Sequence, residues 1–136
     1  MKYDARATRP VSAAPKRVLV VDDDPTFCKI ALRAFTDEGT EVVTAADGLR
    51  AIERLRPGQV DLLVVDLEMP GADGFSVIKH VRSTEGLTKL PVIVITGKKS
   101  LDAIDTVYRL GANSYVTKPV NWALLPYKVK DTLAKA

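Results

Sequence analysis

Five short runs rich in valine and other apolar residues punctuate the sequence, and a stretch of mixed polarity follows each run. The runs are residues 17–22 (RVLVVD), 40–46 (TEVVTAA), 60–66 (VDLLVVD), 91–97 (PVIVITG) and 114–119 (SYVTKP). Apolar runs of this length are typical of strands buried on both faces. The stretches after them carry apolar residues at helical spacing. The sequence therefore predicts an α/β fold, a doubly wound parallel sheet of five strands with five helices on its two faces.

Capping residues, glycine and proline mark the expected helix boundaries. We expect helices within residues 25–39, 47–58, 74–86, 100–112 and 121–136. The residues predicted to cap four of them are Asp24, Asp47, Ser100 and Asn121. Pro126 falls inside the last predicted helix, where it should remove one hydrogen bond and bend the helix.

Length and composition indicate a single globular domain. The chain has 136 residues, of which 46% are hydrophobic and 27% charged, and this suffices for one core. We expect residues 1–15 to be a flexible leader and residues 16–136 to be the domain.

A single cysteine, Cys28, excludes an intrachain disulfide and fits a reducing cytoplasm. With a net charge of only +3 and no long apolar run, the chain is predicted to be cytoplasmic and to bind neither nucleic acid nor membrane directly.

Acidic residues stand at the ends of two predicted strands. Asp22 and Asp23 end the first strand, and Asp66 ends the third. In a flavodoxin-like strand order, 2-1-3-4-5, these strands are neighbours, and ligands bind beyond their carboxyl ends. Two carboxylates ~4 Å apart repel by about 4 kcal/mol at an effective dielectric near 20, whereas one hydrogen bond returns only about 1 kcal/mol. The sequence therefore predicts a divalent cation here, and all-oxygen ligands suit Mg²⁺.

Two other strand ends bring a hydroxyl and an amine to the same edge of the sheet. Thr96 ends the fourth strand, and the fifth runs into Lys118. A cation, a lysine, a hydroxyl and the carboxylate of Asp66 together form a set suited to phosphoryl transfer. An aspartate can serve as the nucleophile and form an acyl phosphate, while the metal and lysine neutralise the phosphoryl oxygens.

Four segments resemble the characteristic segments of response-regulator receiver domains of two-component signalling, the CheY-like superfamily, in order and spacing. They are VLVVDDDP, DLLVVDLEMPGADG, VIVITG and SYVTKP, and the match runs from about Arg17 to the end of the chain. The resemblance implies that Asp66 is the phosphoacceptor and one of the metal ligands. It further implies that Asp23 binds Mg²⁺ directly, that Asp22 acts through water, and that Glu68 supplies its backbone carbonyl.

The same resemblance assigns the remaining site residues. Thr96 and Lys118 match the conserved hydroxyl and lysine, Tyr115 matches the switch aromatic, and the peptide bond from Lys118 to Pro119 is expected to be cis. The sequence also departs from the family pattern. An aromatic residue often follows the Lys-Pro pair, and here Val120 stands there. An acidic pair often precedes the switch aromatic, and here Asn113 and Ser114 stand there.

The function implied by the resemblance is a two-state switch. A sensor histidine kinase or a phosphotransfer protein would donate a phosphoryl group to Asp66, and Thr96 and Tyr115 would then rearrange. The surface of the fourth helix, fifth strand and last helix would change its affinity for a partner, and this surface is also a candidate homodimer interface. The partner is a downstream target or a C-terminal output domain. Residues 119–125 (PVNWALL) resemble receivers that precede cyclic-di-GMP enzyme domains.

Two other functions compete with this one. A small Mg²⁺-dependent phosphatase with an aspartate nucleophile typically has a second acid two residues later, where Glu68 stands here. A receiver-like interaction module that is never phosphorylated is the third reading, although the full acidic, hydroxyl and lysine set disfavours it. On the receiver reading the protein is not an enzyme but assists its own phosphorylation and dephosphorylation.

Overall fold

The computed structural model describes residues 3–4, 9–10 and 14–136. Most of the predicted leader, residues 1–15, therefore lies outside the described residues. Its described parts are residues 14–15 and the short strands β1 (Tyr3–Asp4) and β2 (Arg9–Pro10), which pair antiparallel. Among the described helices, none combines the length and the apolar character that a bilayer span requires.

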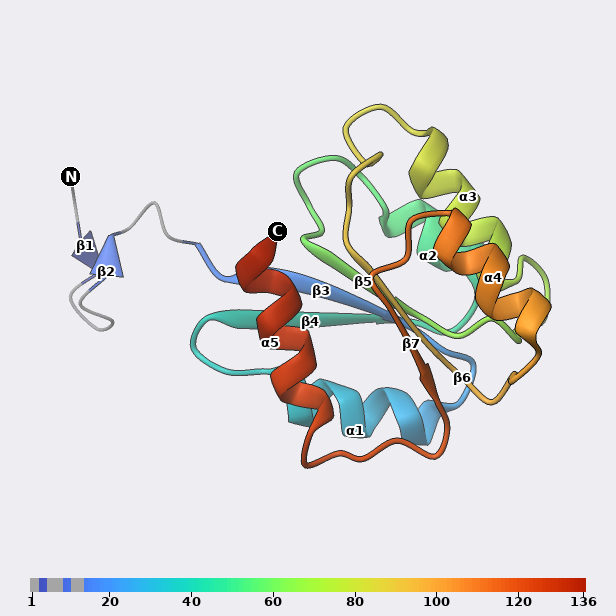
Figure 1. The fold of residues 1–136 in the computed structure, drawn as a ribbon. Coiled ribbons are helices and arrows are strands. Elements are labelled where there is room, and N and C mark those ends of the chain that lie inside the picture. Colours follow the sequence, from blue (N-terminus) through green and yellow to red (C-terminus); the bar gives the residue numbers. More distant parts are fainter. Residues whose placement is uncertain (1–2, 5–8, 11–13) are drawn as a thin grey trace.

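Five parallel strands form the central sheet in the order β4–β3–β5–β6–β7 (Figure 1). Their bounds are β3 (Lys16–Val21), β4 (Thr40–Ala45), β5 (Leu62–Val65), β6 (Val92–Thr96) and β7 (Ser114–Thr117). All four strand pairings are parallel. Counted along the domain, this is the order 2-1-3-4-5, so the predicted flavodoxin-like winding is confirmed.

Helices α1 and α5 lie on one face of the sheet, and α2, α3 and α4 lie on the other (Figure 1). Their bounds are α1 (Pro25–Phe35), α2 (Gly48–Arg54), α3 (Gly74–Ser83), α4 (Leu101–Arg109) and α5 (Leu125–Lys135). The predicted caps Asp24, Asp47 and Ser100 are confirmed, because each side chain accepts a hydrogen bond from a backbone N–H in the first turn. Asp73 caps α3 in the same way.

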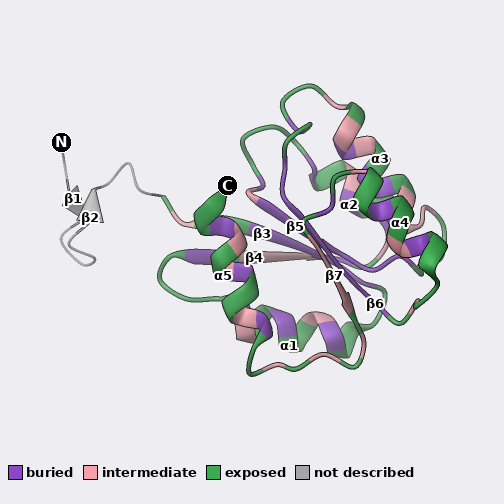
Figure 2. Cartoon of the chain, in the orientation of Figure 1, coloured by how far each residue is buried: buried purple, intermediate pink, exposed green. Residues whose placement is uncertain are grey.

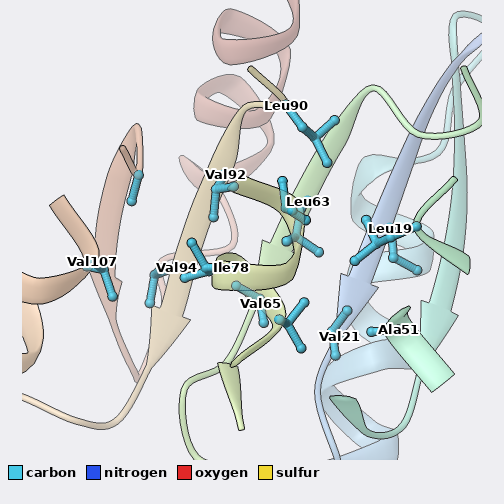
Figure 3. Packing of buried hydrophobic residues seen from close by; sticks show 14 of the residues in the cluster. Leu19, Val21, Ala51, Leu63, Val65, Ile78, Leu90, Val92, Val94 and Val107 are labelled. Carbon is cyan, nitrogen blue, oxygen red and sulfur yellow. The ribbon is translucent and has the colours of Figure 1, made fainter. Parts of the chain in front are cut away.

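Alternate residues of each central strand enter one of two apolar clusters. Leu19 and Val21 pack beneath α2, α3 and α4, whereas Val18 and Val20 pack toward α1 and α5. Figure 3 shows the first cluster, and Figure 2 shows burial along β3, β5 and β6. Complete burial of one such side chain contributes about 1.5–3 kcal/mol. The sheet is therefore a firm platform for the loops at its carboxyl edge.

The last helix begins later than the sequence predicted. Asn121 does not cap it; its side-chain oxygen accepts from the N–H of Ala123, within a turn that precedes α5. The helix starts at Leu125, so Pro126 lies in its first turn rather than inside it. The predicted bend at Pro126 is therefore wrong, because a first-turn residue needs no intrahelical N–H donor and proline is well tolerated there.

Two glycines allow close backbone contacts around the loop between β5 and α3. A Cβ atom on Gly74 would lie 2.3 Å from the carbonyl oxygen of Asp66, and one on Gly48 would lie 2.0 Å from the carbonyl oxygen of Ala72. Both distances are far below van der Waals contact, so neither position accommodates a side chain without moving backbone. The loop is thus held by α3 at one end and by α2 near the other.

The guanidinium of Arg82, near the end of α3, binds backbone carbonyls of two other segments. It donates to the oxygens of Thr88 and Leu90, before β6, at 3.2 and 2.8 Å. It also donates to the oxygens of Leu110 and Gly111, after α4, at 2.7 and 3.0 Å. Burial lowers the pKa of Arg82 from its usual value. One side chain therefore ties together the ends of two helices and the entry to a central strand.

Candidate functional site

The carboxyl edge of the sheet gathers the predicted site residues from four strands. Asp22 and Asp23 follow β3, and Asp66 follows β5 directly. The backbone N–H of Asp66 donates to the oxygen of Val21 at 3.0 Å, which holds the two acidic segments side by side. One carboxylate oxygen from each of Asp22, Asp23 and Asp66 lies within 4.8 Å of the other two. The strand order thus brings together acids that are more than 40 residues apart.

Lys118 forms ion pairs with two of these acids. Its Nζ lies 2.7 Å from Oδ2 of Asp22 and 3.1 Å from Oδ2 of Asp66. Asp22 is 2% exposed and Asp66 is 6% exposed, whereas Asp23 faces solvent. The ammonium group therefore lies between two carboxylates that are shielded from water, while the third acid of the cluster, Asp23, faces solvent.

The pKa values report this competition between burial and charge pairing. Burial raises the pKa of Asp22, although hydrogen bonds from Lys118 and from the backbone of Asp24 oppose the rise. Burial would lower the pKa of Lys118, but its hydrogen bonds to Asp22 and Asp66, together with the attraction of their negative charges, outweigh burial and raise the pKa. The ammonium is thus held in its charged form by the acids around it.

Each buried carboxylate is oriented by a backbone N–H two residues later. Oδ1 of Asp22 accepts from the N–H of Asp24 at 2.9 Å, and Oδ1 of Asp66 accepts from the N–H of Glu68 at 3.1 Å. These are local turns that Asp side chains favour. They leave the Oδ2 atoms of both residues directed at Lys118.

Thr96 and Tyr115 lie at the ends of one short chain of contacts. Thr96 is fully buried, and its Oγ1 accepts from the N–H of Lys98 at 3.3 Å. The hydroxyl of Tyr115 donates to the carbonyl oxygen of Lys98 at 2.5 Å. Burial, with Glu68 and Asp66 nearby, raises the pKa of Tyr115. The main chain at Lys98 therefore connects the hydroxyl at the site with the aromatic residue on β7.

The peptide bond from Lys118 to Pro119 is cis, as predicted. The N–H of Lys118 donates to the oxygen of Thr96 at 2.9 Å, which places the lysine next to the end of β6. The roles assigned to the individual site residues, including the backbone carbonyl of Glu68, stay predictions. Their donor chemistry fits Mg²⁺, since all the clustered ligand atoms are carboxylate oxygens.

One contact of the site did not follow from the sequence. Nζ of Lys118 lies 4.5 Å from the centroid of the Phe27 ring, which belongs to α1. In the sequence, Phe27 is one of several apolar residues at helical spacing within residues 25–39. The sequence shows an aromatic residue soon after the acidic segment. Its contact with Lys118 can be recognised only when the position of the lysine in the fold is known.

The comparisons with known proteins decide the family. The family model described as the response regulator receiver domain matches residues 18–130. The chain belongs to this family. Receiver domains of response regulators act in two-component systems, where they interact with histidine kinases and downstream targets. This assignment favours the receiver over the phosphatase considered above.

Relatives of the receiver include both short and long proteins. The chain is 37% identical over 123 residues to the transcriptional regulatory protein AfsQ1 of Streptomyces coelicolor, covering 89% of this chain and 52% of the relative. It is 36% identical over 115 residues to the chemotaxis protein CheY of Pseudomonas aeruginosa, covering 84% and 93%. The chain thus spans about half the length of the first relative and nearly all of the second.

Solved structures share the fold over nearly their whole length. A receiver domain protein from Methanospirillum hungatei superposes with a TM-score of 0.82 at 27% identity, covering 90% of this chain and 96% of the other. A putative response regulator from Chloroflexus aurantiacus gives a TM-score of 0.79 at 33% identity, covering 88% and 98%.

Proposed function

We propose that Asp66 of this receiver accepts a phosphoryl group from a phosphohistidine of a histidine kinase or phosphotransfer protein. The observation that carries the proposal is a nearly buried carboxylate with an ammonium 3.1 Å away, beside two further acids at the edge of the sheet. In the transfer, an oxygen of Asp66 bonds to phosphorus, the P–N bond breaks, and its electron pair remains on the imidazole nitrogen.

Asp23, Asp66 and the backbone carbonyl of Glu68 would hold Mg²⁺ directly at this site, and Asp22 would act through water. The bound ion would neutralise negative charge on the phosphoryl oxygens. Ligand oxygens on one Mg²⁺ lie no more than ~4.2 Å apart, twice the ~2.1 Å metal–ligand distance. The carboxylate spacing of up to 4.8 Å is therefore only slightly too wide.

Lys118 and Thr96 supply the remaining groups for the proposed switch. Lys118 would follow the new negative charge on the phosphorylated Asp66, and the Thr96 hydroxyl would turn toward a phosphoryl oxygen. That movement would break the hydrogen bond that Thr96 accepts from the N–H of Lys98. The carbonyl oxygen of Lys98 accepts the hydrogen bond of Tyr115, so the change at Thr96 would reach Tyr115. To invert a population from 1:99 to 99:1, phosphorylation must favour one state by about 5.5 kcal/mol.

The proposed readout is the surface formed by α4, β7 and α5. Its partner would be a separate target, as for a stand-alone receiver of the CheY type, or an output domain, as the longer relative allows. Exposed apolar side chains on this side include Leu101 and Tyr108 of α4 and Tyr127 of α5. A homodimer through the same surface stays a prediction, as does a cyclic-di-GMP-related output.

The direct test is mass spectrometry of the wild-type protein after incubation with acetyl phosphate and Mg²⁺. The expected result is the mass of one added phosphoryl group, labile to acid and located on the peptide that contains Asp66. Chelation of the metal should prevent the addition. A protein that gains no phosphate under these conditions would support the unphosphorylated interaction module instead.

Substituting Asn for Asp23 should separate metal binding from folding. The change removes one charge from the acidic cluster, so the metal-free protein should become more stable by up to about 1 kcal/mol. The loss of a carboxylate ligand should weaken Mg²⁺ binding about tenfold or more. Calorimetric titration and thermal unfolding in a chelator measure the two effects. Asp102→Asn, in the exposed first turn of α4, is the matched control, and equal behaviour of the two variants would contradict the metal assignment.

A further inference from the structure

The ammonium group of Lys118 is held from two sides. Asp22 and Asp66 lie at 2.7 and 3.1 Å on one side, and the face of the Phe27 ring lies 4.5 Å away on another. This distance is within the range in which a cation is attracted to an aromatic ring. The Lys118 side chain is only 25% exposed, so water screens the attraction incompletely.

The Phe27 ring is itself fixed by its neighbours. Phe27 is 8% exposed and packs in the cluster between the sheet, α1 and α5. Its ring centroid lies 5.1 Å from that of Trp122, with the planes tilted by 49°. Trp122 also contacts Phe35, at 6.1 Å between centroids. Because Trp122 follows Lys118 by four residues, the segment that supplies the lysine also supports the ring beneath it.

We propose that Phe27, supported by Trp122, is a positioning residue that holds the Lys118 ammonium over Asp66. This inference rests on the proposed function, since it concerns the lysine of that site. A lysine has a flexible stem that loses rotamer freedom when its end is fixed. The ring face and two carboxylates restrict it to one place before a phosphoryl group arrives. The Phe27–Trp122 pair lies in the apolar cluster against which Val120 also packs.

The first test compares phosphorylation rates at saturating Mg²⁺ with acetyl phosphate as the donor. Phe27→Leu keeps an apolar side chain but removes the ring face. Its rate should fall about fivefold, equivalent to ~1 kcal/mol. Phe27→Tyr keeps the ring and should restore the rate. Phe35→Leu is the matched control, because Phe35 is fully buried and contacts Trp122 but not Lys118. Its rate should equal that of the wild type even though the core loses packing.

The second test observes the position of the lysine directly by NMR. Protons on Cε of Lys118 lie near the ring face in the wild type, so their resonances should be shifted upfield. The shift should disappear in Phe27→Leu and persist in Phe27→Tyr and Phe35→Leu. Unshifted resonances in the wild type would overturn the inference, as would equal rates for Phe27→Leu and Phe35→Leu. If the wild type accepts no phosphate at all, the proposed function fails, and the NMR shift still decides where the lysine lies.

Discussion

Asp66→Asn is expected to abolish phosphate incorporation from acetyl phosphate in the presence of Mg²⁺. An amide lacks the negative charge and nucleophilicity of a carboxylate, so no acyl phosphate can form at this position. The variant should remain folded, because the Asn oxygen can still accept from the N–H of Glu68 and Lys118 retains its 2.7 Å contact with Asp22. Intact-mass measurement with and without acid treatment reads the result.

The matched control is Asp73→Asn, seven residues later in the same loop. Asp73 caps α3 by accepting from the N–H of Ser76 at 2.9 Å, and asparagine caps helices about as well as aspartate. This control should incorporate phosphate like the wild type. Mg²⁺-dependent, acid-labile incorporation into Asp66→Asn would show that another residue is the phosphoacceptor.

Arg82→Met should lower the free energy of unfolding by about 3 kcal/mol. The substitution keeps much of the aliphatic stem and removes every donor from four backbone carbonyls. Water can replace the guanidinium at the exposed residues Thr88 and Gly111, but not as readily at the buried Leu90 and half-buried Leu110. Each buried carbonyl oxygen left without a hydrogen-bond donor costs about 1–3 kcal/mol. The total free energy of unfolding of a domain is roughly 5–15 kcal/mol.

Arg109→Met provides the comparison for Arg82. Arg109 is the last residue of α4, but its side chain is 79% exposed, and among the described residues it pairs only with Asp105, at 2.7 Å. An exposed pair of this kind is worth about 0.3–0.5 kcal/mol. Denaturant unfolding of both variants should therefore give clearly different midpoints. Midpoints that fall by the same small amount would mean that the Arg82 hydrogen bonds contribute little beyond what water supplies.

The sheet and the gathering of the acids were predictable because they follow from strong local signals. The buried parts of β3, β5 and β6 are the apolar runs of residues 18–21, 62–65 and 92–95, and a strand buried on both faces needs that composition. Once the winding is known, residues after strand ends share one edge. The proximity of Asp22, Asp66 and Lys118 then follows without any knowledge of side-chain contacts.

The parts that escaped prediction depend on contacts between distant residues or on short turns. The hydrogen bonds of Arg82 reach carbonyls up to 29 residues away, and a carbonyl carries no sequence signal. The start of α5 was placed too early because Asn121 is a good cap, yet the turn it begins ends before the helix. The ring of Phe27 beneath Lys118 depends on two elements at opposite ends of the chain.

The close contacts at Gly48 and Gly74 decide where this domain can be redesigned. Since the backbone fits against backbone at both points, inserting residues at either would push apart the segments that meet there. Between them, Gly71 has a φ of 76° and open space around it. A peptide tag is therefore better grafted at Gly71 than at Gly48 or Gly74, because it would meet open space there instead of packed backbone.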